Sequence, residues 1–434
     1  MGDPDASPSR PPTQPPLSGS PPAAREEGDA ARRPRISPWR FVVVFGVVSL
    51  LADVVYEGAR AVTGPILAAV GASAVVVGVV TGIGESAALL LRFVSGPLTD
   101  RTRRFWAWAI SGYAITIISV PLLGYASVLW VAALLIIAER VGKAVRSPAK
   151  DAMLSFATSQ TGRGRGFAVH EAIDQFGAVL GPLAVAGMLA LTGDDYGPSL
   201  AVLAIPGIAV IALLLWLRAR APQPAMFEDV PAPQAARTRE PVTRLPAVFW
   251  AYSIFVAVTL AGFATFGLVS FHAVQWGIVA TPWIPVLYAA VMVVDALVAL
   301  AVGWLYDRIG AGVLVLLPAI AAVVPALAFS YEPGLFVVGA LLWGAALGVQ
   351  ESTMRAVVAD VVAARRRGTA YGAFGAIAGV AAAIGGALAG WLYDVSIPWL
   401  VAITILLQML AVAVLAVAVV LMRVHRSAEA RSRR

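Results

Sequence analysis

The chain has 434 residues, of which 59% are hydrophobic and only 13% are charged, whereas soluble domains carry about 25% charged residues. This composition excludes a soluble globular protein and indicates a polytopic membrane protein. The net charge of +7 requires no nucleic acid partner, because cationic loops are retained on the inner side of a membrane and contact anionic lipid. The absence of cysteine excludes disulfides, thiolate metal sites and cysteine nucleophiles.

The N-terminal segment, residues 1–36, is rich in Pro, Ser and Ala and has no apolar core. This composition predicts a disordered cytoplasmic tail. The segment is not a signal peptide, because the first apolar run starts near Phe41 and continues as a full span without a small-residue cleavage site.

Twelve apolar stretches are long enough to cross the hydrocarbon core as helices, which takes about 20 residues each. They lie near residues 40–61, 74–96, 105–124, 128–149, 165–191, 198–217, 247–271, 283–305, 311–329, 333–356, 369–391 and 397–422. A segment rich in Pro and Arg, residues 218–246, follows the sixth stretch and is interpreted as a cytoplasmic linker. We therefore expect two six-helix halves, at 37–217 and 247–422, and a basic cytoplasmic tail at 423–434.

Lysine and arginine occur in every second connection between these stretches. The connections predicted on the outer side contain no Lys or Arg, only acids such as Asp194, Glu332 and Asp394. Because positively charged loops stay on the cytoplasmic side, the pattern predicts a multi-pass protein of the cell membrane with both termini in the cytoplasm.

Two short motifs recur six spans apart. The sequence Gly-Pro-Leu-Thr-Asp-Arg ends the second span at 96–101, and Gly-Trp-Leu-Tyr-Asp-Arg ends the eighth at 303–308. An Arg-Gly pair also opens the fifth span at 165–166 and the eleventh at 367–368. Paired six-span units are typical of secondary transporters that rock around a central site.

With these motifs the chain resembles the major facilitator superfamily from about Trp39 to Met422. Residues 96–104 are similar to the superfamily's motif between its second and third helices, although Thr102 and Arg103 stand where a Gly is usual. The resemblance implies the major facilitator fold, an all-α integral membrane protein with 12 transmembrane helices in two pseudo-symmetric halves.

A run of Gly177, Gly181 and Pro182 in the fifth span is similar to the core of a helix-bend motif found in antiporter members. The chain therefore resembles bacterial drug:proton antiporter-like members, and export is favoured.

The resemblance also implies a gating latch in the basic loops after the second and eighth spans, closed in one state and parted in the other. The carboxylate of Asp100 can face the positive N-terminal end of a neighbouring helix, while the arginines meet acidic groups or lipid phosphate. An arginine cluster that only sets topology is the alternative. The predicted latch residues are Gly96, Asp100, Arg101, Arg104, Gly303, Asp307 and Arg308.

Ionisable side chains inside the spans indicate the mechanism, because each costs about 2.5–3.5 kcal/mol at the bilayer centre and such groups usually line a cavity or proton path. Asp53 and Glu57 share one face of the first span, and Glu85 lies near the middle of the second. Burial favours the protonated form of a carboxyl group, which loading and releasing a proton requires. These three are the proton-coupling candidates; alternatively, Glu57 pairs with Arg60, and Glu85 with Arg92 or another cation.

Other charged residues inside the spans are candidates for a substrate cavity. They are Arg92, Glu139, Arg140, Asp174, Asp295 and Glu351. For Lys143, Arg146 and Glu171 we expect structural ion pairs, and His170 is either a pH-responsive gate or a hydrogen-bonded structural residue. We expect the first half to handle ions and the second to supply aromatic surface.

The sequence thus predicts a secondary active transporter that moves a small organic solute by alternating access, with proton-coupled export favoured. Proton-coupled uptake or uniport is the alternative, and a non-transporting membrane sensor would not need paired latches. The chain lacks Gly-x-Ser-x-Gly, His-Glu-x-x-His and Gly-x-x-x-x-Gly-Lys-[Ser/Thr], so we expect neither an enzyme nor ATP-driven transport, and no cofactor or metal. The expected partners are the solute, protons and membrane lipid, not nucleic acid, and the expected state is a monomer.

Overall fold

A computed structural model of the chain describes residues 36–227, 245–362 and 366–432. Within these ranges the regular structure is helical throughout. The predicted N-terminal tail, except Ile36, and most of the predicted linker lie outside the described residues.

The first half contains nine α-helices and one 3-10 helix among the described residues. They are α2 (Pro38–Ala61), α3 (Thr63–Ala69), α4 (Ala74–Leu90), α5 (Arg92–Thr102), α6 (Phe105–Leu123), α7 (Leu129–Thr161), α8 (Arg163–Thr192), α9 (Tyr196–Ala201), α10 (Ala204–Arg220) and η1 (Pro224–Phe227). Sequence signals explain where the first helix begins: the Ser37 hydroxyl accepts a hydrogen bond from the amide of Arg40, and Pro38 occupies the first turn.

The second half contains seven α-helices and one 3-10 helix in the described ranges. They are α11 (Ala247–Ala261), α12 (Phe266–Gln275), α13 (Trp283–Ile309), η2 (Gly310–Val315), α14 (Leu316–Ala328), α15 (Pro333–Val361), α16 (Arg367–Val395) and α17 (Ile397–Ser432). The predicted seventh span is therefore broken, because residues 262–265 between α11 and α12 are not helical.

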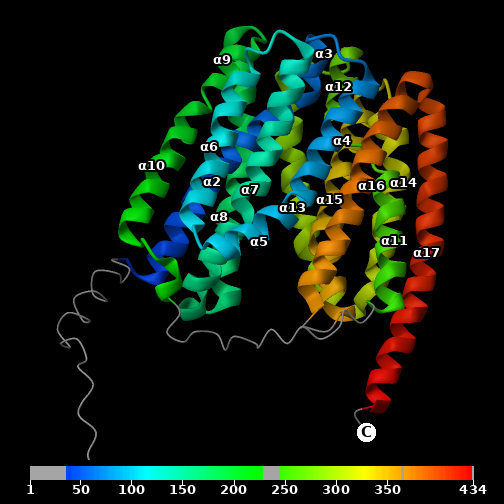
Figure 1. Cartoon of the computed structure of the whole chain (residues 1–434). Helices are drawn as coiled ribbons and strands as arrows, with labels where there is room; N and C mark the ends of the chain where they lie inside the picture. The colour runs from blue at the N-terminus through cyan, green and yellow to red at the C-terminus, as the bar shows by residue number, and fades with distance from the viewer. Residues whose placement is uncertain (1–35, 228–244, 363–365, 433–434) are drawn as a thin grey trace, which may run out of the picture.

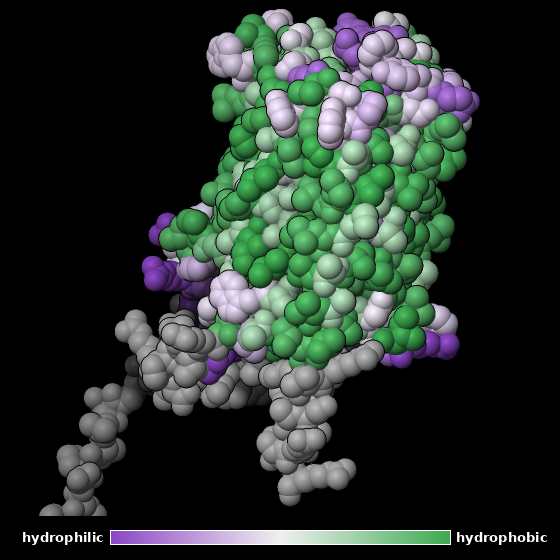
Figure 2. Space-filling view, turned by 90° about the vertical axis from the view of Figure 1, so that its right-hand side faces the viewer, coloured by the Kyte–Doolittle hydropathy of each residue, from purple (hydrophilic) through white to green (hydrophobic). Residues whose placement is uncertain are grey.

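Ten stretches of described helix are long and apolar enough to cross a membrane. One of them, Trp283–Ala328, contains both α13 and α14. Helix α7, which carries several charged residues, is not among the ten. The number twelve accordingly stays a prediction, whereas the wide apolar band on the face shown in Figure 2, in green, agrees with a membrane protein.

The described chain begins and ends at the same end of the helical bundle. In Figure 1, α2 starts at the lower end and α17 finishes there, while the short helices α3, α9 and α12 lie at the opposite end. We refer to these as the terminal end and the far end. That the terminal end faces the cytoplasm remains a prediction.

The two halves meet closely near the far end through glycine. A Cβ added at Gly78 of α4 would lie 2.1 Å from the carbonyl oxygen of Gly386 in α16, and one at Gly390 would lie 2.4 Å from the oxygen of Ala74. At both positions the close approach of the backbones requires glycine, as at other small-residue helix interfaces in membranes.

The carboxylate of Asp394 also joins the halves at this end. It lies in the last turn of α16 and accepts hydrogen bonds from the first amides of α4, those of Ala74 at 3.2 Å and Val75 at 3.0 Å. The first amides of a helix have no partner within it and carry the positive end of its dipole, so an acid from the other half caps α4.

Candidate functional site

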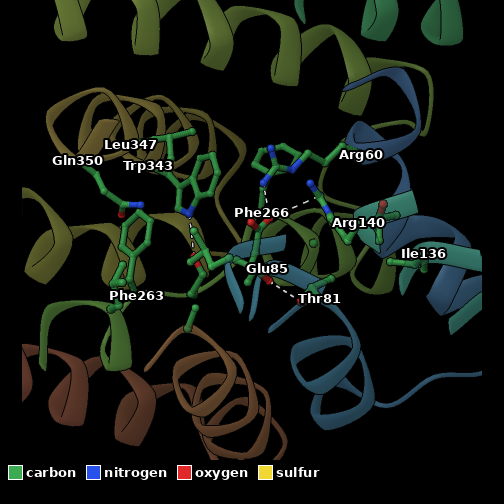
Figure 3. Close-up of a pocket in the computed structure, with 17 residues that line it drawn as sticks. Arg60, Thr81, Glu85, Ile136, Arg140, Phe263, Phe266, Trp343, Leu347 and Gln350 are labelled. Carbon is green, nitrogen blue, oxygen red and sulfur yellow. Dashed lines mark hydrogen bonds and ion pairs between the residues drawn. The ribbon is translucent and has the colours of Figure 1, made fainter. Parts of the chain in front are cut away.

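A cavity of about 120 Å³ lies between the two halves (Figure 3). Helices α2, α3, α4 and α7 contribute one wall, and α11, α12, α15, α16 and the break between α11 and α12 contribute the rest. The lining residues are Arg60, Thr63, Thr81, Glu85, Leu89, Ile136, Arg140, Leu260, Phe263, Ala264, Thr265, Phe266, Gly267, Trp343, Leu347, Gln350 and Ala382. This volume is smaller than the roughly 300–1,000 Å³ of pockets for drug-sized ligands.

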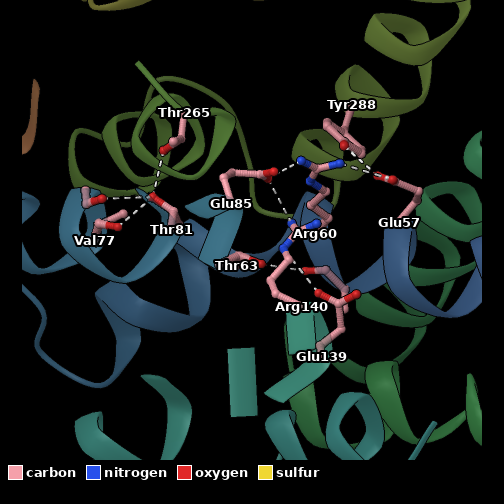
Figure 4. Close-up of polar contacts among 12 residues, drawn as sticks. Glu57, Arg60, Thr63, Val77, Thr81, Glu85, Glu139, Arg140, Thr265 and Tyr288 are labelled. Atoms are coloured by element: carbon pink, nitrogen blue, oxygen red, sulfur yellow. Dashed lines mark hydrogen bonds and ion pairs between the residues drawn. The ribbon is translucent and has the colours of Figure 1, made fainter. Parts of the chain in front are cut away.

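Glu85 is the acidic side chain that lines the cavity in the described part of the chain. Its Oε1 atom contacts a terminal nitrogen of Arg60 from α2 and lies 3.5 Å from Nη2 of Arg140 in α7. One carboxylate of α4 thus ties together cations from two other helices (Figure 4).

Each of these arginines also has a carboxylate on its own helix. Nη1 of Arg60 donates to Glu57 at 3.2 Å, and Nε of Arg140 lies 3.2 Å from Glu139. The Tyr288 hydroxyl of α13 donates to the other Glu57 oxygen at 2.6 Å, so this network reaches into the second half. Arg60 and Arg140 therefore do not depend on Glu85 for charge compensation.

Aromatic and amide side chains of the second half form the opposite wall. Phe263 and Trp343 stack with ring centroids 5.7 Å apart and an interplanar angle of 9°. The indole of Trp343 donates to the carbonyl of Ala264 at 2.7 Å, and the Thr81 and Thr265 hydroxyls are hydrogen-bonded at 2.8 Å across the halves. In Figure 3, Arg60 and Arg140 face this wall across the cavity.

Asp53 is buried but does not line the cavity. It faces α8, where a Cβ added at Gly177 would come within 2.7 Å of its Cβ. The Lys143 ammonium lies 4.5 Å from the centre of the Tyr56 ring, and the Arg146 guanidinium lies over Tyr56 and Tyr113 at 5.0 and 4.7 Å. Asp53 and these cations thus form a polar layer on the terminal side of the cavity.

The remaining predicted cavity residues lie outside the cavity lining. Asp295 is 3% exposed, and its Oδ1 accepts no hydrogen bond from any described residue. Arg92 begins α5, and Glu351 follows the cavity-lining Gln350 in α15. Asp174 belongs to a group with His170 and Glu171 whose possible ligand atoms lie within 4.8 Å of one another, but His170 already shares a 3.0 Å hydrogen bond with Ser49.

The predicted helix-bend residues have a packing role. A Cβ added at Gly177 would lie 2.3 Å from the carbonyl oxygen of Leu50, and one at Gly181 would lie 2.4 Å from that of Val54. Both glycines therefore allow α8 to pack closely on α2, and Pro182 is accommodated inside α8.

The predicted latch residues lie at the ends of α5 and α13. Asp100, Arg101 and Arg104 are exposed, and Gly96 is half-buried in α5. Arg103 ends α5 in the left-handed conformation, with φ of 52°. It lies in the turn where members of the superfamily usually have a glycine.

The corresponding segment of α13 has a different environment. Gly303 is half-buried and Asp307 is exposed, while the Arg308 guanidinium lies 3.6 Å from the centre of the Trp304 ring.

Sequence reasoning identified Glu85 and Arg140 as candidates but missed several cavity residues. Arg60 was seen only as a partner of Glu57, while Thr81, Thr265 and Gln350 were not singled out. An uncharged polar side chain in an apolar stretch was the available signal, but many such residues bond only within their own helix, as Ser253 does with the Phe249 carbonyl.

Comparisons with known proteins agree with this architecture. The family model described as Major Facilitator Superfamily matches residues 43–294 and 272–434. An uncharacterized protein of Mycobacterium tuberculosis is 60% identical over 381 residues, which cover 88% of this chain and 93% of the relative. An uncharacterized MFS-type transporter of Methanocaldococcus jannaschii is 24% identical over 365 residues, covering 82% and 89%.

Among solved structures, the peptide transporter POT in complex with sulfate is similar, with a TM-score of 0.71. The match covers 92% of this chain and 98% of that one at 13% identity, so the similarity concerns the fold.

Proposed function

The chain belongs to the Major Facilitator Superfamily and is a membrane transporter rather than an enzyme; from this premise we propose that it is a proton-coupled secondary transporter of a small organic solute. The solute binds in the cavity between the halves, and the halves rock around it so that the cavity opens to one side of the cell membrane at a time. Glu85 carries the coupled proton.

The shared carboxylate of Glu85 is the observation that carries this proposal. It lines the cavity and interacts with Arg60 and Arg140, which lie on two other helices. Protonation of Glu85 removes the charge that attracts both guanidinium groups, and deprotonation restores it. Protonation of the Glu85 carboxylate therefore changes how α2, α4 and α7 are held together beside the solute.

The direction of transport depends on whether the solute and the proton exclude each other from the cavity or bind there together. Export by antiport, which the Gly177, Gly181 and Pro182 motif favours, requires proton and solute to exclude each other. Protonated Glu85 instead releases arginine donors toward the cavity, so a solute that accepts hydrogen bonds binds together with the proton. This geometry supports uptake by symport, and close packing of α8 on α2 accounts for the two glycines without export.

The first test is proton movement in liposomes that contain the purified full-length chain, an internal pH dye and an imposed pH gradient. A panel of organic anions, cations and neutral solutes is added outside. We expect at least one solute to move protons inward with the parent chain, and Glu85→Gln to abolish solute-driven proton movement while solute exchange at equal pH persists.

Two variants complete this test. Asp194→Asn is the matched control, because Asp194 is an exposed acid outside the cavity, and it should behave as the parent. If Glu85→Gln keeps full proton movement and Asp53→Asn loses it, Asp53 is the coupling carboxylate and the proposal for Glu85 is wrong. Proton efflux driven by inward solute movement would support antiport.

A further inference from the structure

Building on the proposed function, we infer that the transported solute is a small organic monoanion with a planar apolar portion, and that the protonated form of Glu85 is the form that binds it. Three independent features of the cavity carry this inference: its charge balance, its free hydrogen-bonding groups and its aromatic wall.

Ionised Glu85 supplies the one negative charge among the described residues of the cavity lining. The lining also contains two cations, Arg60 and Arg140, which Glu57 and Glu139 engage from outside it. Lys143 of α7, beyond the lining, is opposed by Glu57 and Asp53.

Protonating Glu85 removes the negative charge of the cavity lining and leaves the two arginines there. A monoanionic solute replaces that charge, whereas a cationic solute would bind beside two guanidinium groups whose shared carboxylate is neutral. Because a charge away from water is costly without an opposite charge beside it, the form with protonated Glu85 selects anions. The other lining residues near Glu85 carry no charge. They are Thr81 from α4, Thr265 from the break between α11 and α12, and Ala382 from α16.

The arginines have the right donors for an anionic group. Glu57 and Glu139 engage Nη1 of Arg60 and Nε of Arg140, respectively. The nitrogens that meet Glu85 are Nη2 in both residues, and they face the cavity. When Glu85 is neutral, these two donors can bind the oxygens of a carboxylate or sulfonate without losing their own-helix partners.

The opposite wall favours a flat ring with a hydrogen-bond donor. Phe263 and Trp343 stack on each other beside the cavity, and Leu260 and Leu347 add apolar surface. Oε1 of Gln350 is buried, lines the cavity and accepts no hydrogen bond from any described residue. A buried acceptor without a partner is costly, so a solute hydroxyl or amine that donates to it stabilises the complex.

The experiment uses ring compounds that differ in charge and keep the same charge at both working pH values. Benzenesulfonate, neutral benzenesulfonamide and cationic benzyltrimethylammonium are titrated into the purified full-length chain by calorimetry at pH 6 and pH 8. We expect benzenesulfonate to bind at least ten times more tightly than the other two, and more tightly at pH 6 than at pH 8.

Glu85→Gln mimics the protonated form. It should bind benzenesulfonate more tightly than the parent does at pH 8, and equally at both pH values, although it transports no protons. Gln350→Leu should weaken binding of 4-hydroxybenzenesulfonate about fivefold, as expected for one hydrogen bond, and leave benzenesulfonate unchanged.

The two proposals fail in different ways. Preferential binding of benzyltrimethylammonium or benzenesulfonamide overturns the inferred solute class, even if Glu85→Gln loses proton coupling. Binding of benzenesulfonate that is as tight at pH 8 as at pH 6 overturns the role of protonated Glu85. If the anion binds as expected but the parent moves no protons in liposomes, the solute class holds and the proposed coupling is wrong.

Discussion

Glu85 and Asp53 both lie near the middle of their predicted spans, yet their surroundings differ because the two side chains point toward different neighbours. Glu85 faces the space between the halves, where Arg60 and Arg140 meet it. Asp53 faces Gly177 across the tight contact of α2 with α8. The position of a residue along a span can be predicted from a sequence, whereas the direction in which its side chain points depends on how the helix packs against its neighbours.

The Tyr288 hydroxyl donates a hydrogen bond from the second half to the Glu57 carboxylate of the first half. We predict that Tyr288→Phe lowers the free energy of unfolding by about 1.5–3 kcal/mol, which is the range for a hydrogen bond to a charged group. Tyr288 is fully buried, and its loss leaves one oxygen of Glu57 without its 2.6 Å donor. The measurement is unfolding in mixed detergent micelles at increasing dodecyl sulfate fraction.

Tyr252→Phe is the matched control for this prediction. Tyr252 is equally buried, but its hydroxyl donates to the neutral carbonyl of Met354 at 3.1 Å within the second half. The control should cost about 0.5–1.5 kcal/mol. Equal losses for the two variants would contradict a special contribution from the bond to Glu57.

Much of the residue-level chemistry was predictable, but the contacts between helices were not. The intramembrane acids and arginines stand out in an apolar sequence because each is costly there, and the pairing of Glu57 with Arg60 follows from their spacing of three on one helix. The contact of Glu57 with Tyr288 joins residues 231 positions apart. No local pattern encodes such a contact, because it arises from the packing of α2 against α13.

At the scale of elements, the break between α11 and α12 supplies part of the cavity wall. The apolar run 247–271 predicts one continuous span, but the chain leaves the helix between Ala261 and Phe266. This break places the side chain of Phe263 and the carbonyl of Ala264 beside Trp343. Discontinuous helices occur at the midplane sites of secondary transporters because their free backbone groups and irregular shape serve the ligand. Composition alone cannot reveal such a break when its residues are apolar.

The cap that Asp394 places on α4 holds the two halves together at the far end, and we predict that Asp394→Ala opens this end more often. Ser73 remains the N-cap residue of α4, but loss of side-chain hydrogen bonds to the first amides of a helix costs about 1 kcal/mol, and a difference of that size shifts a two-state equilibrium about fivefold. Because the chain contains no cysteine, Ala382→Cys in the cavity lining supplies a single thiol. Its labelling rate by a membrane-impermeant maleimide added at the far side should rise about fivefold.

Asp195→Ala is the control for this effect. Its carboxylate caps α9 through a 2.8 Å hydrogen bond from the amide of Gly197, but both residues belong to the first half. Removing this cap should leave the labelling rate of Ala382→Cys unchanged. If both substitutions speed labelling equally, general loosening of helix ends explains the result and the cap on α4 does not control opening.

At the scale of the whole molecule, the distribution of charge over the two ends decides which way the bundle sits in the membrane. The terminal end carries Arg101, Arg104 and Arg308, whereas the far end carries Asp194 and other acids. Lys and Arg near the ends of spans are retained on the cytoplasmic side, which is why orientation could be predicted before the fold was known. The wide apolar band in Figure 2 supplies no such information, because on the face shown it lies between the two ends and does not distinguish them.

We predict that the far end is extracellular, and single cysteines in this cysteine-free chain test it directly. Asp194 is exposed in the turn between α8 and α9, and Ser159 is exposed near the end of α7 at the opposite end. In intact cells, an impermeant maleimide should label Asp194→Cys at once and Ser159→Cys only after permeabilisation. The reverse pattern would invert the orientation, and inward solute movement in the proposed symport would then begin at the terminal end. Labelling of both without permeabilisation would contradict the single crossing, that of α8, which separates these two residues.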